Sequence, residues 1–183
     1  PVLNINKVSI INDLFEFFSQ RITTLIEDRG VDADIVNAVC ENKAAIERLL
    51  SDPSDAQKRA ELLMEMRQSG ELSAIQTVVA RASRITDKAG WQLNSLSALD
   101  VVKQDLFEKS SEMAMLKVIN LLEPIVKSSS DDRYVALAKG LVSGSEAISS
   151  FFDGENSVMV MTDEIIIRNN RLNLLRVLCN QAS

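Results

Sequence analysis

Apolar residues recur along this chain at the three- and four-residue spacing of an amphipathic helix, and this periodicity decides what it can fold into. Between residues 6 and 28 the apolar positions are Ile11, Leu14, Phe15, Phe18, Ile22, Leu25 and Ile26. Gly30 follows this stretch and is suited to end it. Six glycines and three prolines in 183 residues are too few for a turn-rich sandwich or barrel. The pattern therefore predicts an all-α protein.

Start and stop residues divide the pattern into seven to nine predicted helices, which form a helical bundle. Ser54 with Gln57 three residues later fits a capping box, and Gly90 stands where a helix should end. Pro124 should bend or end the helix that contains it. Residues 158–161 could be extended, but their Val and Met side chains are expected to pack in the core. We predict helices over residues 6–28, 32–39, 44–50, 54–69, 71–88, 111–127 and 131–152, and from residue 162 onward.

The length suits one ordinary domain or two small ones, and 46% hydrophobic residues support a real core. We expect one all-helical domain over residues 1–183. Pro1 in place of Met indicates a piece of a larger protein. No apolar run reaches the roughly 18 residues that a membrane span needs, and no signal-peptide pattern opens the chain.

The chain contains no histidine, which is the usual general base near neutral pH and the commonest metal ligand. A Ser-His-Asp or Cys-His arrangement is therefore impossible, and so is a His-based zinc site. Cys40 and Cys179 lie far apart and form no CxxC pair, so reduced thiols are expected. No glycine-rich phosphate-binding motif occurs. We predict no catalytic residues and no metal site in these 183 residues.

The net charge of −6 hides a basic island on one predicted helix. Asp87 is the one acid close in sequence to Arg81, Arg84 and Lys88. At about 100° per residue, these three cations share an arc of about 60° that lies away from the apolar face. Trp91 follows shortly after the helix. A basic strip with one stacking aromatic suits single-stranded RNA, such as an anticodon loop, whereas the alternative interpretation is an ordinary solvated helix face.

A second basic island lies in the last predicted helix, whose arginines have no acid among them. Arg168 and Arg171 project among apolar residues at helical spacing, and an isolated buried charge is costly. We therefore predict that both form structural ion pairs, with Asp153 and Asp163 as candidate partners. Arg176 points away from the apolar stripe and is a further candidate RNA contact.

Three short runs in the last third of the chain form a recognisable series. The letters are FFD at residues 151–153, VMVM at 158–161 and RNNRLNLL at 168–175. This series resembles the C-terminal signature of the β subunit of bacterial-type glycyl-tRNA synthetase. FEFFSQR at 15–21 and DADIVNAV at 32–39 resemble the opening of the same region. The resemblance therefore extends over nearly the whole chain.

The resemblance implies an all-helical anticodon-binding domain, similar to the one in arginyl-tRNA synthetase, that grips the anticodon arm of glycine tRNA. Aminoacylation, with its ATP and Mg²⁺, would take place on the α subunit or a catalytic domain, and this piece would not be catalytic. Many family members carry a lysine where this chain has Ser83, and residues 154–157 lengthen the link between the first two runs. Similarity to cyanobacterial or chloroplast members implies the bacterial cytoplasm or the chloroplast stroma.

Two functions therefore follow from the sequence. The first is tRNA binding in support of glycylation elsewhere, with glycine tRNA and the α subunit or catalytic domain as partners. The alternative is an all-helical protein-interaction scaffold without RNA binding, whose acidic outer faces and apolar grooves would dock another protein.

Overall fold

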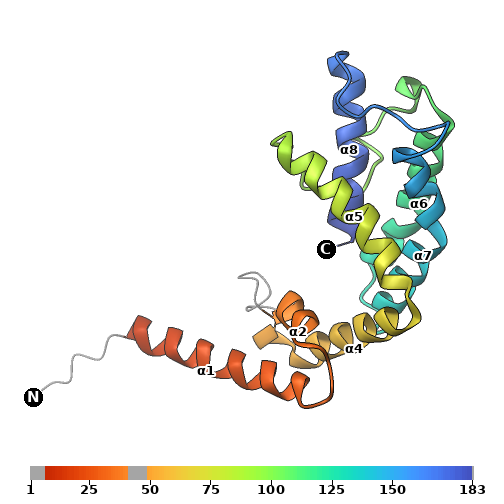
Figure 1. Ribbon diagram of the computed structural model, residues 1–183. Helices are drawn as coiled ribbons and strands as arrows, with labels where there is room; N and C mark the ends of the chain where they lie inside the picture. Colours follow the sequence, from red (N-terminus) through yellow and green to blue (C-terminus); the bar gives the residue numbers. More distant parts are fainter. Residues whose placement is uncertain (1–6, 41–48, 183) are drawn as a thin grey trace, which may run out of the picture. The chain divides into compact units, whose positions relative to one another are not determined.

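The computed structural model describes residues 7–40 and 49–182, and in these residues it contains helices and no strand. The all-α prediction is confirmed (Figure 1). The last helix begins at Ile165 rather than at residue 162, and most of the helix predicted over 44–50 lies outside the described residues. The elements are α1 (Lys7–Glu27), α2 (Ala33–Cys40), α4 (Pro53–Ser69), α5 (Glu71–Lys88), the 3₁₀ helix η1 (Gln104–Leu106), α6 (Ser110–Val126), α7 (Arg133–Phe152) and α8 (Ile165–Gln181).

The chain groups into two compact units, residues 1–69 and 70–183, where we expected one domain over residues 1–183. The first unit has an apolar core made from its own helices, which is the physical reason for the division. Gly70 stands between α4 and α5 with a φ of 82°, a left-handed conformation that favours glycine. Each unit is described by itself.

In the first unit, α1, α2 and α4 contact one another. Arg67 of α4 donates hydrogen bonds to Asp32 at 2.8 Å and to the two oxygens of Asp34 at 2.8 and 2.6 Å. The bonds from Arg67 hold the pKa of the Asp34 carboxyl below its ordinary value. The core residues are Ile26, Val31, Ile35, Val36, Val39, Cys40, Leu49, Ala56 and Ala60.

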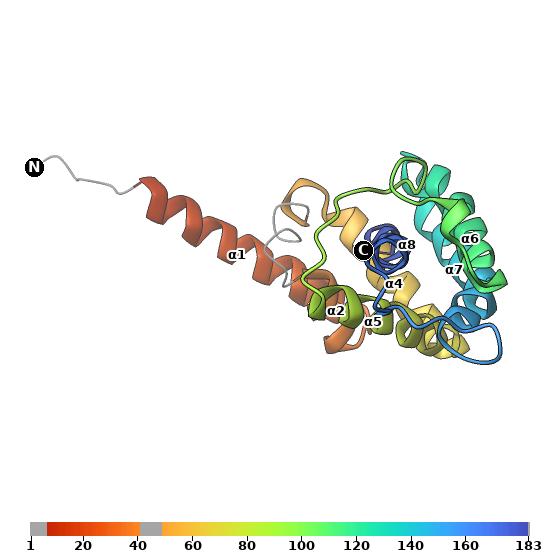
Figure 2. The same cartoon turned by 90° about the horizontal axis from the view of Figure 1, so that it is seen from above.

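In the second unit, α8 lies between α5 and α6 and contacts both, as the end-on view in Figure 2 shows. Helices α6 and α7 pack closely because two glycines of α7 face α6. A Cβ atom on Gly144 would come within 2.6 Å of Val118, and one on Gly140 within 2.6 Å of Leu122. These glycines therefore allow an approach that larger residues would prevent.

Amide side chains of α8 hold the irregular segment between α5 and α6. Asn170 accepts a hydrogen bond from the backbone N–H of Lys103 at 2.8 Å and donates one to its carbonyl at 2.9 Å. Asn180 donates to the carbonyls of Leu93 and Ser95 at 2.8 and 3.0 Å. Backbone groups of a segment whose one regular element is the short η1 thus find partners in the amide side chains of α8, which fixes this segment against α8.

Candidate nucleic-acid interface

Helix α5 presents its cations on the side opposite to its core-facing residues. The buried positions are Leu72, Ile75, Val78, Ala82 and Thr86. Arg84 and Lys88 are exposed, and Thr77 is exposed on the same face. The Arg84 Nε donates only to the carbonyl of Ala80 in its own helix, at 3.2 Å. The guanidinium and ammonium groups therefore lie where an RNA phosphate could reach them.

Arg81 is engaged within the second unit. Its Nη1 lies 2.8 Å from both carboxylate oxygens of Asp153, just beyond the end of α7. Its guanidinium also stands over the ring of Phe152, with the Cζ 4.8 Å from the ring centroid. We predicted Asp153 as a partner of the α8 arginines. This prediction is wrong, because Asp153 pairs with Arg81 of α5. Arg81 ties α5 to α7, and its contact with RNA stays a prediction.

Arg176 and Trp91 are also engaged. Arg176 has a side chain only 23% exposed, and its Nη1 donates to Asp87 at 3.2 Å. We predicted that Arg176 points away from the rest of the domain, and this is wrong. The side of α8 that carries Arg176 packs against α5. The half-buried Trp91 donates its Nε1–H to Asn173 at 2.9 Å. Neither residue has been shown to contact RNA, and those roles stay predictions.

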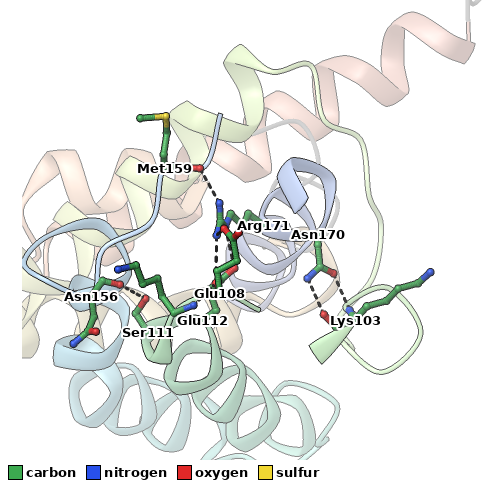
Figure 3. A network of polar contacts seen from close by, with 9 residues as sticks. Lys103, Glu108, Ser111, Glu112, Asn156, Met159, Asn170 and Arg171 are labelled. Atoms are coloured by element: carbon green, nitrogen blue, oxygen red, sulfur yellow. Dashed lines mark hydrogen bonds and ion pairs between the residues drawn. The ribbon is translucent and has the colours of Figure 1, made fainter. Parts of the chain in front are cut away.

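Arg171 forms a buried ion pair at the centre of the second unit (Figure 3). Its Nε lies 2.9 Å from Glu112 Oε1, with the two side chains 4% and 0% exposed. Arg171 also donates to Glu108 at 2.7 Å and to the Met159 carbonyl at 3.2 Å. Burial opposes the charge of Arg171, yet the bonds to Glu112 and Glu108 raise its pKa above the ordinary value. The residue is structural, as expected, but its partners are Glu112 and Glu108.

Glu112 was not expected from the sequence, although its position carried a signal. It lies in the first turn of α6, where its Oε2 accepts the backbone N–H groups of Glu108 and Lys109 at 2.8 and 2.9 Å. A glutamate at the third position of a helix is the acidic member of a capping box. Glu112 therefore caps α6 and pairs with Arg171 at the same time.

Two further expectations about the C-terminal signature are wrong. Arg168 donates to the Thr162 carbonyl at 3.4 Å, and neither it nor Asp163 forms an ion pair with another described residue. Met159 and Met161 are exposed rather than packed in the core, whereas Val160 between them is buried. Figure 3 shows the Met159 side chain pointing away from the polar network that holds its carbonyl.

Comparison with known proteins identifies the family of the second unit. A model of the DALR anticodon binding domain matches residues 75–181, which include most of α5 and all of α6, α7 and α8. The chain belongs to the DALR anticodon-binding domain family. The match lies within the second unit, and the DALR domain here is therefore the part that carries Arg84, Lys88 and the Arg171–Glu112 pair.

Curated relatives extend the similarity to the first unit. The glycine–tRNA ligase β subunit of Picosynechococcus sp. is 37% identical over 180 residues, which cover 97% of this chain and 25% of that protein. The β subunit of Gloeothece citriformis is 39% identical over 181 residues, with the same coverages. That of Natranaerobius thermophilus is 27% identical over 168 residues, 91% of this chain and 22% of that protein. The chain thus spans about a quarter of the length of the relatives it matches.

No group of three or more Cys, Asp or Glu side chains in the described residues is arranged to hold a metal ion. No helix in the described residues is both long enough and apolar enough to cross a membrane.

Proposed function

We propose that this chain binds glycine tRNA through the anticodon arm, as part of a glycine–tRNA ligase. The observation that carries the proposal is the DALR match over residues 75–181, together with the exposed cations of α5 inside the matched range. The β-subunit names of the relatives support the choice of ligase. ATP-dependent glycylation, with its Mg²⁺, would take place on another subunit or domain of that ligase.

The α5 face offers two kinds of RNA contact. Lys88 supplies a compact ammonium that neutralises phosphate and releases counterions, which makes binding depend on salt. Arg84 supplies a planar guanidinium that can fork onto a phosphate or stack against an unpaired base. Thr77, about two turns before Arg84 on the same face, adds a hydroxyl. These groups suit a loop of unpaired nucleotides better than the deep groove of an RNA duplex.

The ion pairs around α5 support the same proposal indirectly. Arg81 pairs with Asp153, and Arg176 pairs with Asp87. Each arginine offsets a carboxylate that would otherwise repel the phosphate backbone close to Arg84. The two arginines therefore contribute to the local potential without needing to touch the RNA.

The test is binding of glycine tRNA by the purified chain at low and moderate salt. We expect salt-dependent binding that weakens when the anticodon loop is replaced by a stable tetraloop. Equal affinity for both RNAs would contradict anticodon-arm recognition. No binding at low salt would instead favour the protein-interaction scaffold, for which the exposed Met159, Met161, Ile165 and Ile166 offer an apolar surface.

A further inference from the structure

Helix α1 carries an apolar stripe that its own unit leaves uncovered. At about 100° per residue, the members of this stripe fall within an arc of about 100°, the width of a helix face that normally meets a core. Their exposed fractions run from 44% to 55%. The α1 stripe consists of Ile10, Leu14, Phe17, Phe18 and Leu25.

The first unit uses a different side of α1. The buried Ile26 and the partly buried Ile22 pack into the core with α2 and α4, and both lie beside the stripe rather than in it. Figure 1 shows the N-terminal turns of α1 extending beyond these two helices. Phe17 and Phe18 stand edge to face with ring centroids 5.6 Å apart, so the middle of the stripe is an aromatic pair. A contiguous apolar surface of this kind marks a contact with another macromolecule.

We propose that the α1 stripe is covered by α1 of a second copy of this chain, with the two helices antiparallel and the two-fold axis between Phe17 and Phe18. This register sets Phe17 against Phe18 of the other copy, and Ile10 against Leu25 of the other copy. An isologous dimer needs one surface that complements itself, and the stripe is close to symmetric about this axis.

The charges in and beside the stripe select the antiparallel arrangement. Arg21 lies within the arc, with its Cζ 5.6 Å from the centroid of the Phe17 ring, and the exposed Asp13 lies about 40° outside the arc. In the antiparallel register, Arg21 of one copy falls opposite Leu14 of the other, one position from Asp13, or about 1.5 Å along the axis. Two Arg21–Asp13 pairs therefore form across the dimer. A parallel pair would instead set Arg21 against Arg21 and Asp13 against Asp13.

The size of the stripe fits a weak dimer. A buried aromatic or large aliphatic side chain removes on the order of 150–200 Å² from water, so five half-exposed ones bury on the order of 400–500 Å² per copy. The total of about 900 Å² lies below the roughly 1,200 Å² of stable specific interfaces and within the range of weak, transient ones. We therefore expect a dissociation constant in the micromolar range, about 1–100 µM.

Sedimentation velocity of the 183-residue chain, from about 1 to about 200 µM, measures this association. We expect a reversible shift from monomer to dimer that stops at the dimer. The exposed pair Phe17→Glu/Phe18→Glu should weaken the dimer at least about tenfold, with the helical content unchanged by circular dichroism. A monomer at every concentration, or growth beyond a dimer, would overturn the proposal.

A charge exchange tests the register and does not depend on how the phenylalanine variant folds. Asp13→Arg and Arg21→Asp should each weaken the dimer, and the double variant should regain most of the parent affinity. These residues are eight apart on one helix, too far to pair within a copy. Failure of the double variant to recover would contradict the antiparallel register even if the chain dimerises.

Discussion

Arg171 of α8 donates its Nε–H to Glu112 of α6 across 2.9 Å, and neither side chain has appreciable access to water. Glu112 caps α6 through the backbone N–H groups of Glu108 and Lys109, while Arg171 holds the carbonyl of Met159. One pair of side chains therefore joins two helices and the loops before each of them. The Arg171 contact fixes the backbone of Met159, whose side chain is exposed.

Removing either member of the pair should destabilise the second unit strongly. Arg171→Ala leaves the Glu112 carboxylate buried without its cation, and the expected loss in free energy of unfolding is about 3–5 kcal/mol. Urea denaturation measures it. The double variant Arg171→Met/Glu112→Leu should lose less than the single one, because no uncompensated charge remains. A single variant that unfolds at the parent's urea midpoint would show that the pair contributes nothing.

Asn170 should matter far more than its neighbour Asn169. Asn170→Ala removes both hydrogen bonds to the backbone of Lys103, and leaving buried polar groups unsatisfied costs about 1–3 kcal/mol. Amide hydrogen exchange of Lys103 should accelerate at the same time. Asn169→Ala is the matched control and should change neither quantity. Equal effects of the two substitutions would contradict the anchoring role.

Gly144→Ala should destabilise the chain, although alanine is the better helix former. The added Cβ would lie 2.6 Å from Val118, and overpacking of this kind costs about 1–3 kcal/mol. Thermal unfolding in a double-mutant cycle isolates the clash. Val118→Ala should remove most of the penalty of Gly144→Ala, and purely additive effects would mean that α6 and α7 adjust without strain.

The Arg67–Asp34 contact should give the first unit a dependence on acid pH. Because the folded-state pKa of Asp34 is lowered, its contribution is complete above the ordinary pKa of about 3.9 and is lost as the pH falls through the lowered value. Arg67→Gln should flatten the stability profile in this acidic window. The effect is small because the pair is exposed. Unfolding curves recorded at several pH values measure this dependence. A free energy of unfolding that falls with acid as steeply in the variant as in the parent would contradict the assignment.

Helix positions were predictable because periodicity, glycine stops and the prolines act locally. Most of the predicted helices match α1, α2 and α4 to α8. The sequence motif in α8 indicated the family correctly. Arg171 could be placed in the interior because its helical spacing sets it among apolar residues. These inferences need no knowledge of which helices are neighbours.

Ion-pair partners were not predictable in the same way. Arg171 meets Glu112, which is 59 residues away, and Arg81 meets Asp153, which is 72 residues away. Which acid pairs with which arginine depends on how α5, α6 and α8 pack. The spacing of residues along one helix does not predict that packing. The exposure of Met159 was missed for a related reason, because hydrophobicity favours burial but does not decide which of four neighbouring residues faces outward.

The most direct test of tRNA binding by α5 compares two double charge reversals by fluorescence anisotropy with labelled glycine tRNA. Arg84→Glu/Lys88→Glu changes the exposed face of α5, and Lys117→Glu/Lys139→Glu makes the same change in net charge on α6 and α7. We expect the α5 variant to weaken binding by at least about tenfold and to lower the salt slope by about 2, with thermal stability retained. We expect a much smaller loss for the α6–α7 variant. Equal affinities and salt slopes for the two variants would contradict tRNA binding by α5.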